Sequence, residues 1–274
     1  MNETTSSGPL FDTGFSAVGG QTRPQPLKVI LSSARHPSMS REEFFNHLSN
    51  IHAPLVQSLP ETMRYIGKYV QNHSRLAADG APTDTAYPHL TTRDSVIELW
   101  FDTKEMFLDL MSAPNYAEVV RPDEARFNDL SKLIVVATQE QRKHVNALLA
   151  IVGGPAQIKT FDFVKRKHGM STEDFAALWP AYQKALTGSQ AYERNVAAHV
   201  WNSALTPASN PFGVAADYDG VVETWFQSYE ALGQFQREYA ATRKLMDLES
   251  QLVSRLDSFS VVAEERPIYD NLRR

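Results

Sequence analysis

The residues that most clearly suggest chemistry are two glutamates in two apolar strands. The segment DSVIELWF carries Glu98, and the segment DGVVETWF carries Glu223 about 125 residues later. Strand side chains alternate between two faces, so Glu98 lies with Trp100 and Glu223 with Trp225, opposite the aliphatic residues. A buried carboxylate costs several kcal/mol unless it is paired or protonated. Either both glutamates anchor loops or pair with an arginine such as Arg64, or they perform acid–base chemistry.

A second group of polar residues accompanies Glu223. In the strand KTFDFV, alternation predicts that Phe161 and Phe163 face helices and that Asp162 faces the opposite side. His199 lies on a further strand, and we expect it to share the inner side. A carboxyl group beside a histidine is suited to general acid–base catalysis. We therefore predict that Asp162, His199 and Glu223 line one cavity.

The first half of the chain offers a related but different set. Tyr69 and His73 align with His199 and Ser203, and the position of Asp162 is taken by Leu31. His52 ends the first predicted helix, where a structural role is the simplest interpretation. The candidate catalytic residues are His199, Glu223, Asp162, Glu98 and Tyr69. The candidate substrate-binding residues are Trp225, Trp100, Trp201, His73 and His52.

Similar segments recur in the same order in both halves, which indicates a tandem duplication. HPSMSREEFF resembles KHGMSTEDFA, and SKLIVVATQE resembles DSFSVVAEER. Each half has the pattern strand, helix, strand, strand, helix, strand, which is typical of ferredoxin-like domains. We predict an α+β fold in which two ferredoxin-like βαββαβ repeats, 27–148 and 156–274, pack sheet to sheet as an intramolecular dimeric α+β barrel. Residues 1–26 are predicted to be a flexible tail.

The predicted elements position these residues. Ser40 and Glu43 form a capping box before a helix, and the next predicted strands are 64–72, 95–101 and 132–138. Two connections, 74–93 and 203–218, are long for hairpins, and long loops in compact domains are often functional lids.

The composition excludes several classes of function. The 274 residues include no cysteine, and the net charge is −5 without a concentrated basic surface. Neither metal-ligand spacing nor GxGxxG, P-loop or GxSxG motifs are found. We expect no metal, no cofactor, no nucleic-acid partner and no membrane association, and a cytoplasmic location. A homodimer is compatible with the sequence.

The first half resembles an EthD domain in the segments RHPSMSREEFF, HAPLV, YVQNH, IELWFD and PNYAEVVRPDEARF. The second half resembles it more weakly, because Gln183 replaces the histidine of HAPLV. The resemblance implies a dimeric α+β barrel. It also implies a pocket for apolar, often phenolic, compounds.

From the residues and this resemblance we expect a cofactor-independent lyase acting on an aromatic or polyketide-like compound. The reaction would be a decarboxylation, a dehydration or a related elimination, with His199 as acid or base. Alternatives are a cofactor-free monooxygenase or isomerase on a phenolic substrate, a non-catalytic small-molecule binding protein, and a haem protein.

Overall fold

The computed structural model describes residues 25–141, 144–149 and 158–272. The strands are β1 (Leu27–Ser33), β2 (Lys68–Ser74), β3 (Ser95–Phe101), β4 (Ile134–Glu140), β5 (His144–Val145), β6 (Ile158–Val164), β7 (Val196–Ala204), β8 (Gly220–Phe226) and β9 (Phe259–Asp270). The α-helices are α1 (Arg41–His47), α2 (Ala53–Ser58), α3 (Pro60–Tyr65), α4 (Lys104–Ser112), α5 (Arg121–Phe127), α7 (Thr172–Thr187), α8 (Gln190–Asn195), α9 (Tyr229–Ala241) and α10 (Arg243–Leu252). Shorter turns are the π-helical η1 (Leu48–His52) and η3 (Tyr116–Val120) and the 3-10 helices η2 (Ala77–Asp79) and η4 (Leu130–Lys132).

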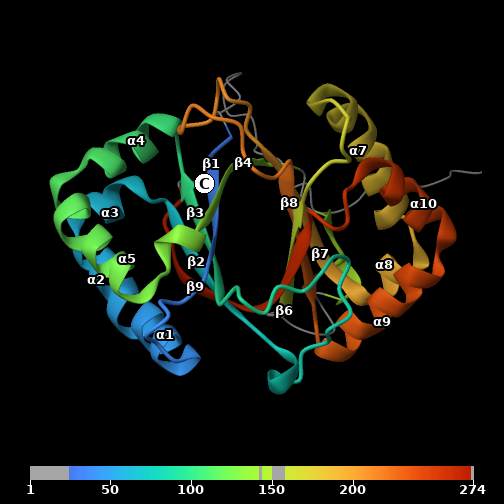
Figure 1. Ribbon diagram of the computed structural model, residues 1–274, viewed down its shortest axis with the longest axis horizontal. Coiled ribbons are helices and arrows are strands. Elements are labelled where there is room, and N and C mark those ends of the chain that lie inside the picture. The colour runs from blue at the N-terminus through green and yellow to red at the C-terminus, as the bar shows by residue number, and fades with distance from the viewer. Residues whose placement is uncertain (1–24, 142–143, 150–157, 273–274) are drawn as a thin grey trace, which may run out of the picture.

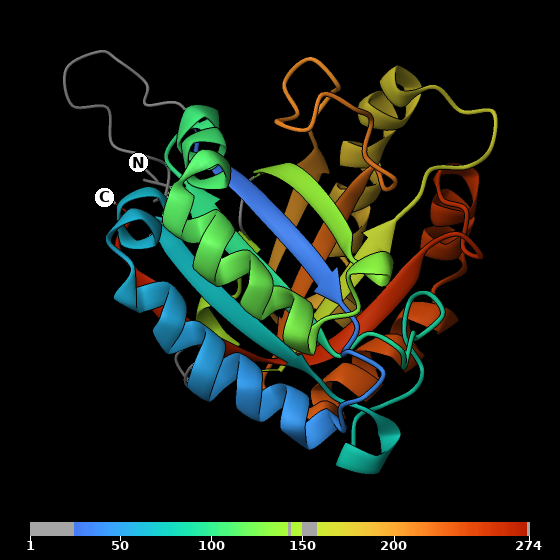
Figure 2. The same ribbon diagram turned by 60° about the vertical axis from the view of Figure 1, so that its left-hand side comes forward.

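Eight of these strands close into an antiparallel barrel. Their order is β4-β1-β3-β2-β9-β6-β8-β7, and the pairing of β4 with β7 closes the ring. The pairings β2–β9 and β4–β7 join the first half of the chain to the second. Helices α1–α5 cover one side of the barrel and α7–α10 the other (Figures 1 and 2).

The α+β class and a closed antiparallel barrel are confirmed, whereas its construction from two ferredoxin-like repeats stays a prediction. The strand order of the first half, β1 to β4, recurs as β6 to β9 in the second half. That the halves arose by duplication, with limits at 27–148 and 156–274, stays a prediction. Most of the predicted tail, residues 1–24, lies outside the described residues. None of the described helices is both long and apolar enough to cross a bilayer.

Local sequence explains how the first helical segment presents its side chains. The hydroxyl of Ser40 accepts from the amide of Glu43, and the Glu43 carboxylate accepts from the amide of Ser40, as the capping box predicts. The chain then widens into η1 before Pro54, whose ring would clash with the carbonyl four residues earlier in a regular helix. The wide turn buries His52 and leaves Ile51 exposed.

The barrel interior is packed with side chains, as expected for eight strands. One apolar cluster inside it includes Phe161 and Phe163, which are fully buried with Val221 and Val261. The prediction that these two phenylalanines face the helices is therefore wrong. The reason is that both faces of these strands are buried, so apolar character alone does not identify the helix side.

The two long loops each cross to the opposite half. In the β2–β3 loop, Tyr87 joins the core between α7–α10 and the sheet of the second half. In the β7–β8 loop, Leu205 packs on the core of the first half, and the Phe212 ring lies 5.4 Å from that of Phe107 on α4. Each half is thus partly covered by a loop from the other.

Candidate functional site

Glu98 and Glu223 meet at the centre of the barrel, on the face that alternation predicts. Lys28 lies 2.9 Å from the carboxylate of Glu98 and also contacts Glu223, while Lys159 lies 2.6 Å from Glu98 and contacts Glu223 as well. All four side chains are at most 1% exposed. Burial opposes ionisation of Glu98, but the two lysines outweigh it and lower its pKa. Burial and the charge of Glu98 raise the pKa of Glu223 to about 7.

Amide and indole groups complete this ion cluster. Asn72 donates to Glu98 at 2.8 Å, and Asn202 donates to Glu223 at 2.6 Å. Nζ of Lys28 lies 4.4 Å from the ring centroid of Trp100, and Nζ of Lys159 lies 4.2 Å from the ring centroid of Trp225. The two predicted tryptophans therefore face the interior, but they contact the ion cluster rather than the predicted histidine.

Asp162 and His199 lie on the opposite face of the sheet, toward the helices. Asp162 accepts a hydrogen bond from Ser260 at 2.5 Å, and His199 contacts Thr224 at 3.1 Å and Gln183 on α7. The prediction that Asp162, His199 and Glu223 share one cavity is therefore wrong. Strand β7 is polar on both faces, so alternation could not decide which face is inward.

The second-half cavity that contains Asp162 and His199 is small. Its volume is about 30 Å³, enough for about one water molecule. Burial raises the pKa of Asp162 to about 7 and lowers that of His199 to about 3. Trp201 packs nearby, with its ring centroid 4.6 Å from that of Trp179.

Tyr69 and His73 also face helices rather than the barrel interior. The side-chain amide of Gln71 donates to the hydroxyl of Tyr69 at 2.8 Å and to the carbonyl of Leu48 at 2.9 Å. The imidazole of His73 stacks on Phe45 of α1 at 4.4 Å. Their predicted inward orientation is wrong for the same reason as that of His199.

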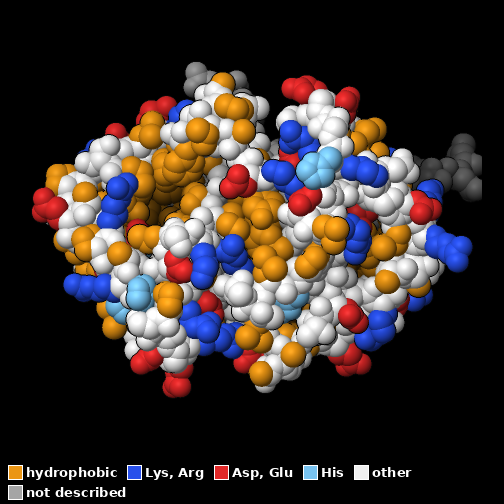
Figure 3. All heavy atoms as spheres, in the orientation of Figure 1, with side chains coloured by type: hydrophobic (Ala, Val, Ile, Leu, Met, Phe, Trp, Pro, Cys, Tyr) orange, Lys and Arg blue, Asp and Glu red, His pale blue; other side chains and the backbone are white. Residues whose placement is uncertain are grey.

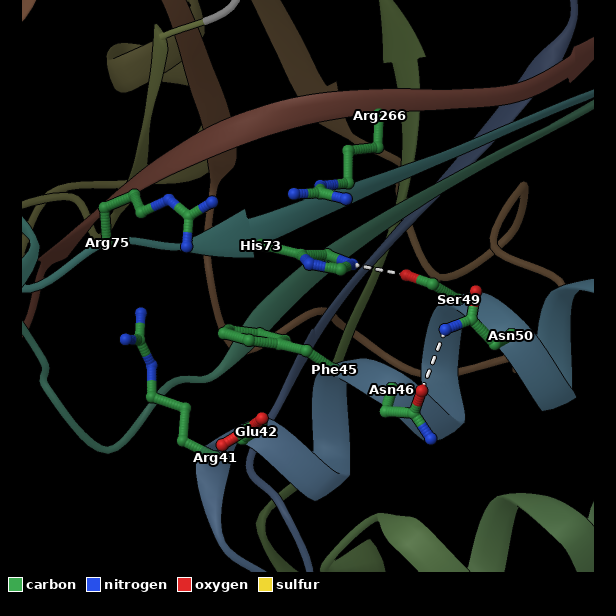
Figure 4. A pocket seen from close by; sticks show the side chains of 9 residues that line it. All are labelled: Arg41, Glu42, Phe45, Asn46, Ser49, Asn50, His73, Arg75 and Arg266. Carbon is green, nitrogen blue, oxygen red and sulfur yellow. Dashed lines mark hydrogen bonds between the residues drawn. The ribbon is translucent and has the colours of Figure 1, made fainter.

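An open pocket of about 580 Å³ lies beside this stacked pair. Figure 4 shows Arg41, Arg75 and Arg266 approaching it from α1, the end of β2 and β9. Arg41 pairs with Asp79 at 2.7 Å, and Arg75 pairs with Glu264, so both cations are neutralised locally. Burial and the nearby arginines lower the pKa of His73 to about 3, which leaves this imidazole neutral.

An apolar cleft opens at the surface between α4 and the first-half sheet (Figure 3). The helix-facing side chains of this sheet, Leu31, Ile97, Leu99 and Val135, are only half-buried. In the second half, the helix-facing residues of β8 are fully buried. Figure 3 shows the surface hollowed between α4 and the strands β1 and β3, with hydrophobic side chains along the hollow.

Two histidines and one aspartate form a cluster that is linked to one wall residue of this first-half cleft through Phe127. The carboxylate of Asp123 contacts Nδ1 of His52 and Nε2 of His47, each at 2.9 Å. Burial opposes ionisation of Asp123, but the hydrogen bonds from both imidazoles outweigh it and lower its pKa. His52 packs against Phe127 at 4.9 Å between ring centroids, and Phe127 also contacts Ile97 of the cleft wall.

A carboxyl group of different character lies close by. Glu124 accepts a hydrogen bond from the hydroxyl of Tyr116 at 3.1 Å. Burial raises the pKa of Glu124, opposed in part by a positive charge on His52, so the two side chains are electrostatic neighbours. A histidine oriented by an aspartate therefore lies near a carboxyl group whose pKa is raised by burial.

Comparison with known proteins identifies a similarity in the first half of the chain. Residues 36–131 match the model of the EthD domain, so this part of the chain is similar to EthD domains. The conidial pigment biosynthesis dehydratase EthD of Metarhizium robertsii is 27% identical over 124 residues, covering 42% of this chain and 85% of that protein. Dehydratase ustZ of Ustilaginoidea virens is 26% identical over 114 residues, covering 39% and 79%.

Comparison of structures identifies the same barrel over the whole chain. The crystal structure of an anthrone oxidase-like protein superposes with a TM-score of 0.59 at 12% identity, covering 91% of this chain and 96% of that one. At this identity the likeness shows the fold alone.

The residues matched by the EthD model include the polar cluster around His52. His47, His52, Tyr116, Asp123 and Glu124 all fall within the matched residues, whereas Asp162 and His199 fall outside them. Among the described residues, no three His, Asp or Glu side chains are grouped to hold a metal ion.

Sequence reasoning missed Asp123, Glu124 and Tyr116 as site residues. All three belong to the segment PNYAEVVRPDEARF, in which the pair Asp123-Glu124 follows Pro122 at the start of α5. Acidic residues in a first helical turn normally stabilise the helix, so the pattern alone does not identify a site. The buried lysines of the barrel were missed because neither stands out from surface lysines in the sequence.

Proposed function

We propose that this protein is a dehydratase, and that its EthD-like region removes water from a hydroxylated, fused-ring compound of the polyketide type. The observation that carries the proposal is the His52–Asp123 pair, which interacts electrostatically with Glu124 and packs on Phe127, a neighbour of the cleft residue Ile97. Two curated relatives that are named dehydratases support it. The half-buried aliphatic wall of the first-half cleft suits a flat apolar ring system.

The arrangement supplies the two proton transfers that dehydration needs. Asp123 binds Nδ1–H of His52, which fixes the tautomer whose Nε2 carries a lone pair. Nε2 has no hydrogen-bond partner among the described residues, and it would remove a proton from the carbon beside a substrate carbonyl. Glu124, whose pKa is raised by burial, would donate a proton to the departing hydroxyl group.

The reaction balances without a redox step. One C–H bond and one C–O bond break, one C=C bond forms, and the hydroxyl group leaves as water. The proton on His52 then returns to Glu124 through solvent. Because only protons move, acid–base side chains are sufficient, and we include independence from any cofactor in the proposal.

A fused-ring β-hydroxyketone that becomes a naphthol on losing water tests this function. We expect purified protein to form the fluorescent naphthol at the same rate with and without oxygen. Glu124→Gln should lower the rate on the order of a hundredfold or more, the typical contribution of one acid or base. A rate that depends on oxygen would favour a monooxygenase, and binding without turnover would favour a carrier; either would contradict the proposal.

A further inference from the structure

The second-half cavity is filled by a side chain from the first half of the chain. The β2–β3 loop crosses over the sheet and places Tyr87 among the residues that line this cavity, where it is 5% exposed. The loop is held there by its backbone: the amide of Tyr87 donates to the Ser260 hydroxyl at 3.2 Å, and the amide of Ser260 donates to the carbonyl of Pro88 at 3.0 Å. Arg255 also donates to the carbonyl of Ala86.

The cavity binds both the hydroxyl group and the ring of Tyr87. The phenol donates a hydrogen bond to the buried carboxylate of Glu249 at 2.9 Å. The guanidinium of Arg255 lies 5.7 Å from the ring centroid and also pairs with Glu249. Tyr182 and Tyr239, whose hydroxyl groups lie 2.8 Å apart, line the same cavity. These contacts are those that a free phenol would need: an acceptor for the O–H, a cation at the ring face and aromatic neighbours.

Two polar donors of the lining are not satisfied by the protein. Nε1 of Trp179 and the side-chain nitrogen of Gln183 are buried without a hydrogen-bond partner among the described residues. Buried donors are normally paired, because an unpaired one costs about 1–3 kcal/mol. Their presence beside a cavity of about 30 Å³ indicates a lining adapted to a polar occupant.

Within the part of the chain that the structure describes, no equivalent side chain fills the first-half cleft. The β7–β8 loop crosses in the opposite direction, but its Phe212 packs edge-on against Phe107 of α4 and stays 44% exposed. The first-half cleft accordingly keeps its half-buried apolar wall, while the second-half cavity is closed. The difference between the two spaces follows from one side chain, Tyr87.

We propose that the second-half cavity is a binding site for a single phenolic ring, which the Tyr87 side chain occupies in place of a free ligand. Removing this ring would turn the cavity into a site for a small phenol. This second site is separate from the proposed dehydratase site, and its test needs no turnover.

The variant Tyr87→Ala removes the atoms of one phenol molecule, so phenol itself is the probe. Tyr87→Ala leaves an aromatic-sized void and loses the packing of the ring, so we expect it to lower Tm by on the order of 10 °C. A ligand that fills this void should restore the lost packing. Phenol at about ten times its Kd should then raise the Tm of this variant by roughly 3–6 °C more than that of the wild type. Calorimetry should show one phenol site more in Tyr87→Ala than in the wild type.

Controls separate phenol recognition from simple void filling. Benzene should stabilise Tyr87→Ala less than phenol, and the added change Glu249→Leu should remove this preference. Phe212→Ala, which removes the aromatic ring of the other crossing loop, should gain no phenol site. If Tyr87→Ala does not fold alone, refolding with phenol in the buffer should restore it. Equal phenol binding by Tyr87→Ala and wild type, or no recovery of folding with phenol, would overturn the proposal.

Discussion

At the residue scale, the contact between His52 and Asp123 decides which imidazole nitrogen can accept a proton. Asp123 is buried at 3% exposure and binds two histidines, so its carboxylate fixes the orientation of His52. Glu124, the next residue, has the opposite character, because burial raises its pKa while Asp123 stays ionised. Two adjacent carboxyl groups thereby take different roles.

The first prediction concerns this orientation. Asp123→Asn keeps the shape but can donate to Nδ1, which favours the tautomer that places the proton on Nε2. We expect kcat for dehydration to fall on the order of a hundredfold, with the fold unchanged by circular dichroism. His47→Gln, which leaves the His52–Asp123 contact in place, is the matched control and should lose less than tenfold. An active Asp123→Asn enzyme would remove Asp123 from the mechanism.

The second prediction concerns Asp162 and the pH dependence of stability. Its pKa is raised to about 7, so its contribution to stability is present below the unfolded pKa and is lost as pH rises through 7. The Asp162 side chain is only half-buried, and solvent therefore reduces the effect of its pKa shift. We expect the free energy of unfolding to fall by about 3 kcal/mol across this pH range. Asp162→Asn should abolish most of it. Parallel unfolding curves of both proteins from pH 4 to 8 would check this, and identical pH profiles would contradict it.

The residues also show where sequence reasoning ends. Glu98 could be placed correctly because Ile97, Leu99 and Phe101 make one face of its strand wholly apolar. His199 could not, because Asn202 makes the other face of β7 polar as well. Asn202 is needed inside the barrel because it binds Glu223 on the neighbouring strand β8, and this contact is not visible in either segment alone.

At the scale of the elements, two π-helical turns position the proposed catalytic groups. His52 is the last residue of η1, and Tyr116 is the first residue of η3. Each turn is followed two residues later by a proline, Pro54 or Pro122. A widened turn avoids the clash of the proline ring with the preceding carbonyl, and such turns are frequent at functional sites. Sequence patterns predicted the capping box and the strands β1 and β3. The sequence predicts that the second strand begins at residue 64, but it begins at Lys68 because α3 extends to Tyr65.

The third prediction concerns the loop that covers the first-half cleft. Phe212 contacts Phe107 of α4 but is 44% exposed, so its loss removes little burial. We expect Phe212→Ala to raise KM several-fold with little change in kcat, because the wall of the cleft and not its acid–base groups is altered. The melting temperature should change by only about 1–2 °C. A loss of kcat with unchanged KM would show that this loop acts on the chemistry instead.

At the scale of the whole molecule, the ion cluster in the barrel joins the two halves. Lys28 of the first half contacts Glu223 of the second, and Lys159 of the second contacts Glu98 of the first. The sequence predicted two packed sheets, since each ferredoxin-like half leaves one face bare. It could not predict that these faces meet through charges, or that each long loop reaches the opposite half, because both depend on contacts between distant segments.

The fourth prediction concerns this cluster. Lys28→Met leaves two buried carboxylates with one of their two lysines, and we expect the free energy of unfolding to fall by about 3–5 kcal/mol. The double variant Lys28→Met/Glu223→Leu removes one charge of each sign, and it should recover part of that loss. Urea unfolding of both variants measures the difference. A double variant that is less stable than Lys28→Met would contradict the account of the cluster.

The central claim is that the first half of the chain performs the chemistry, through His52. The most direct measurement compares His52→Gln with His199→Gln in the naphthol-forming assay, since both variants replace a buried imidazole by the same amide. We predict that His52→Gln loses at least about a hundredfold in kcat/KM and that His199→Gln keeps nearly full activity. An active His52→Gln protein together with an inactive His199→Gln protein would contradict the account and move the reaction to the second-half cavity.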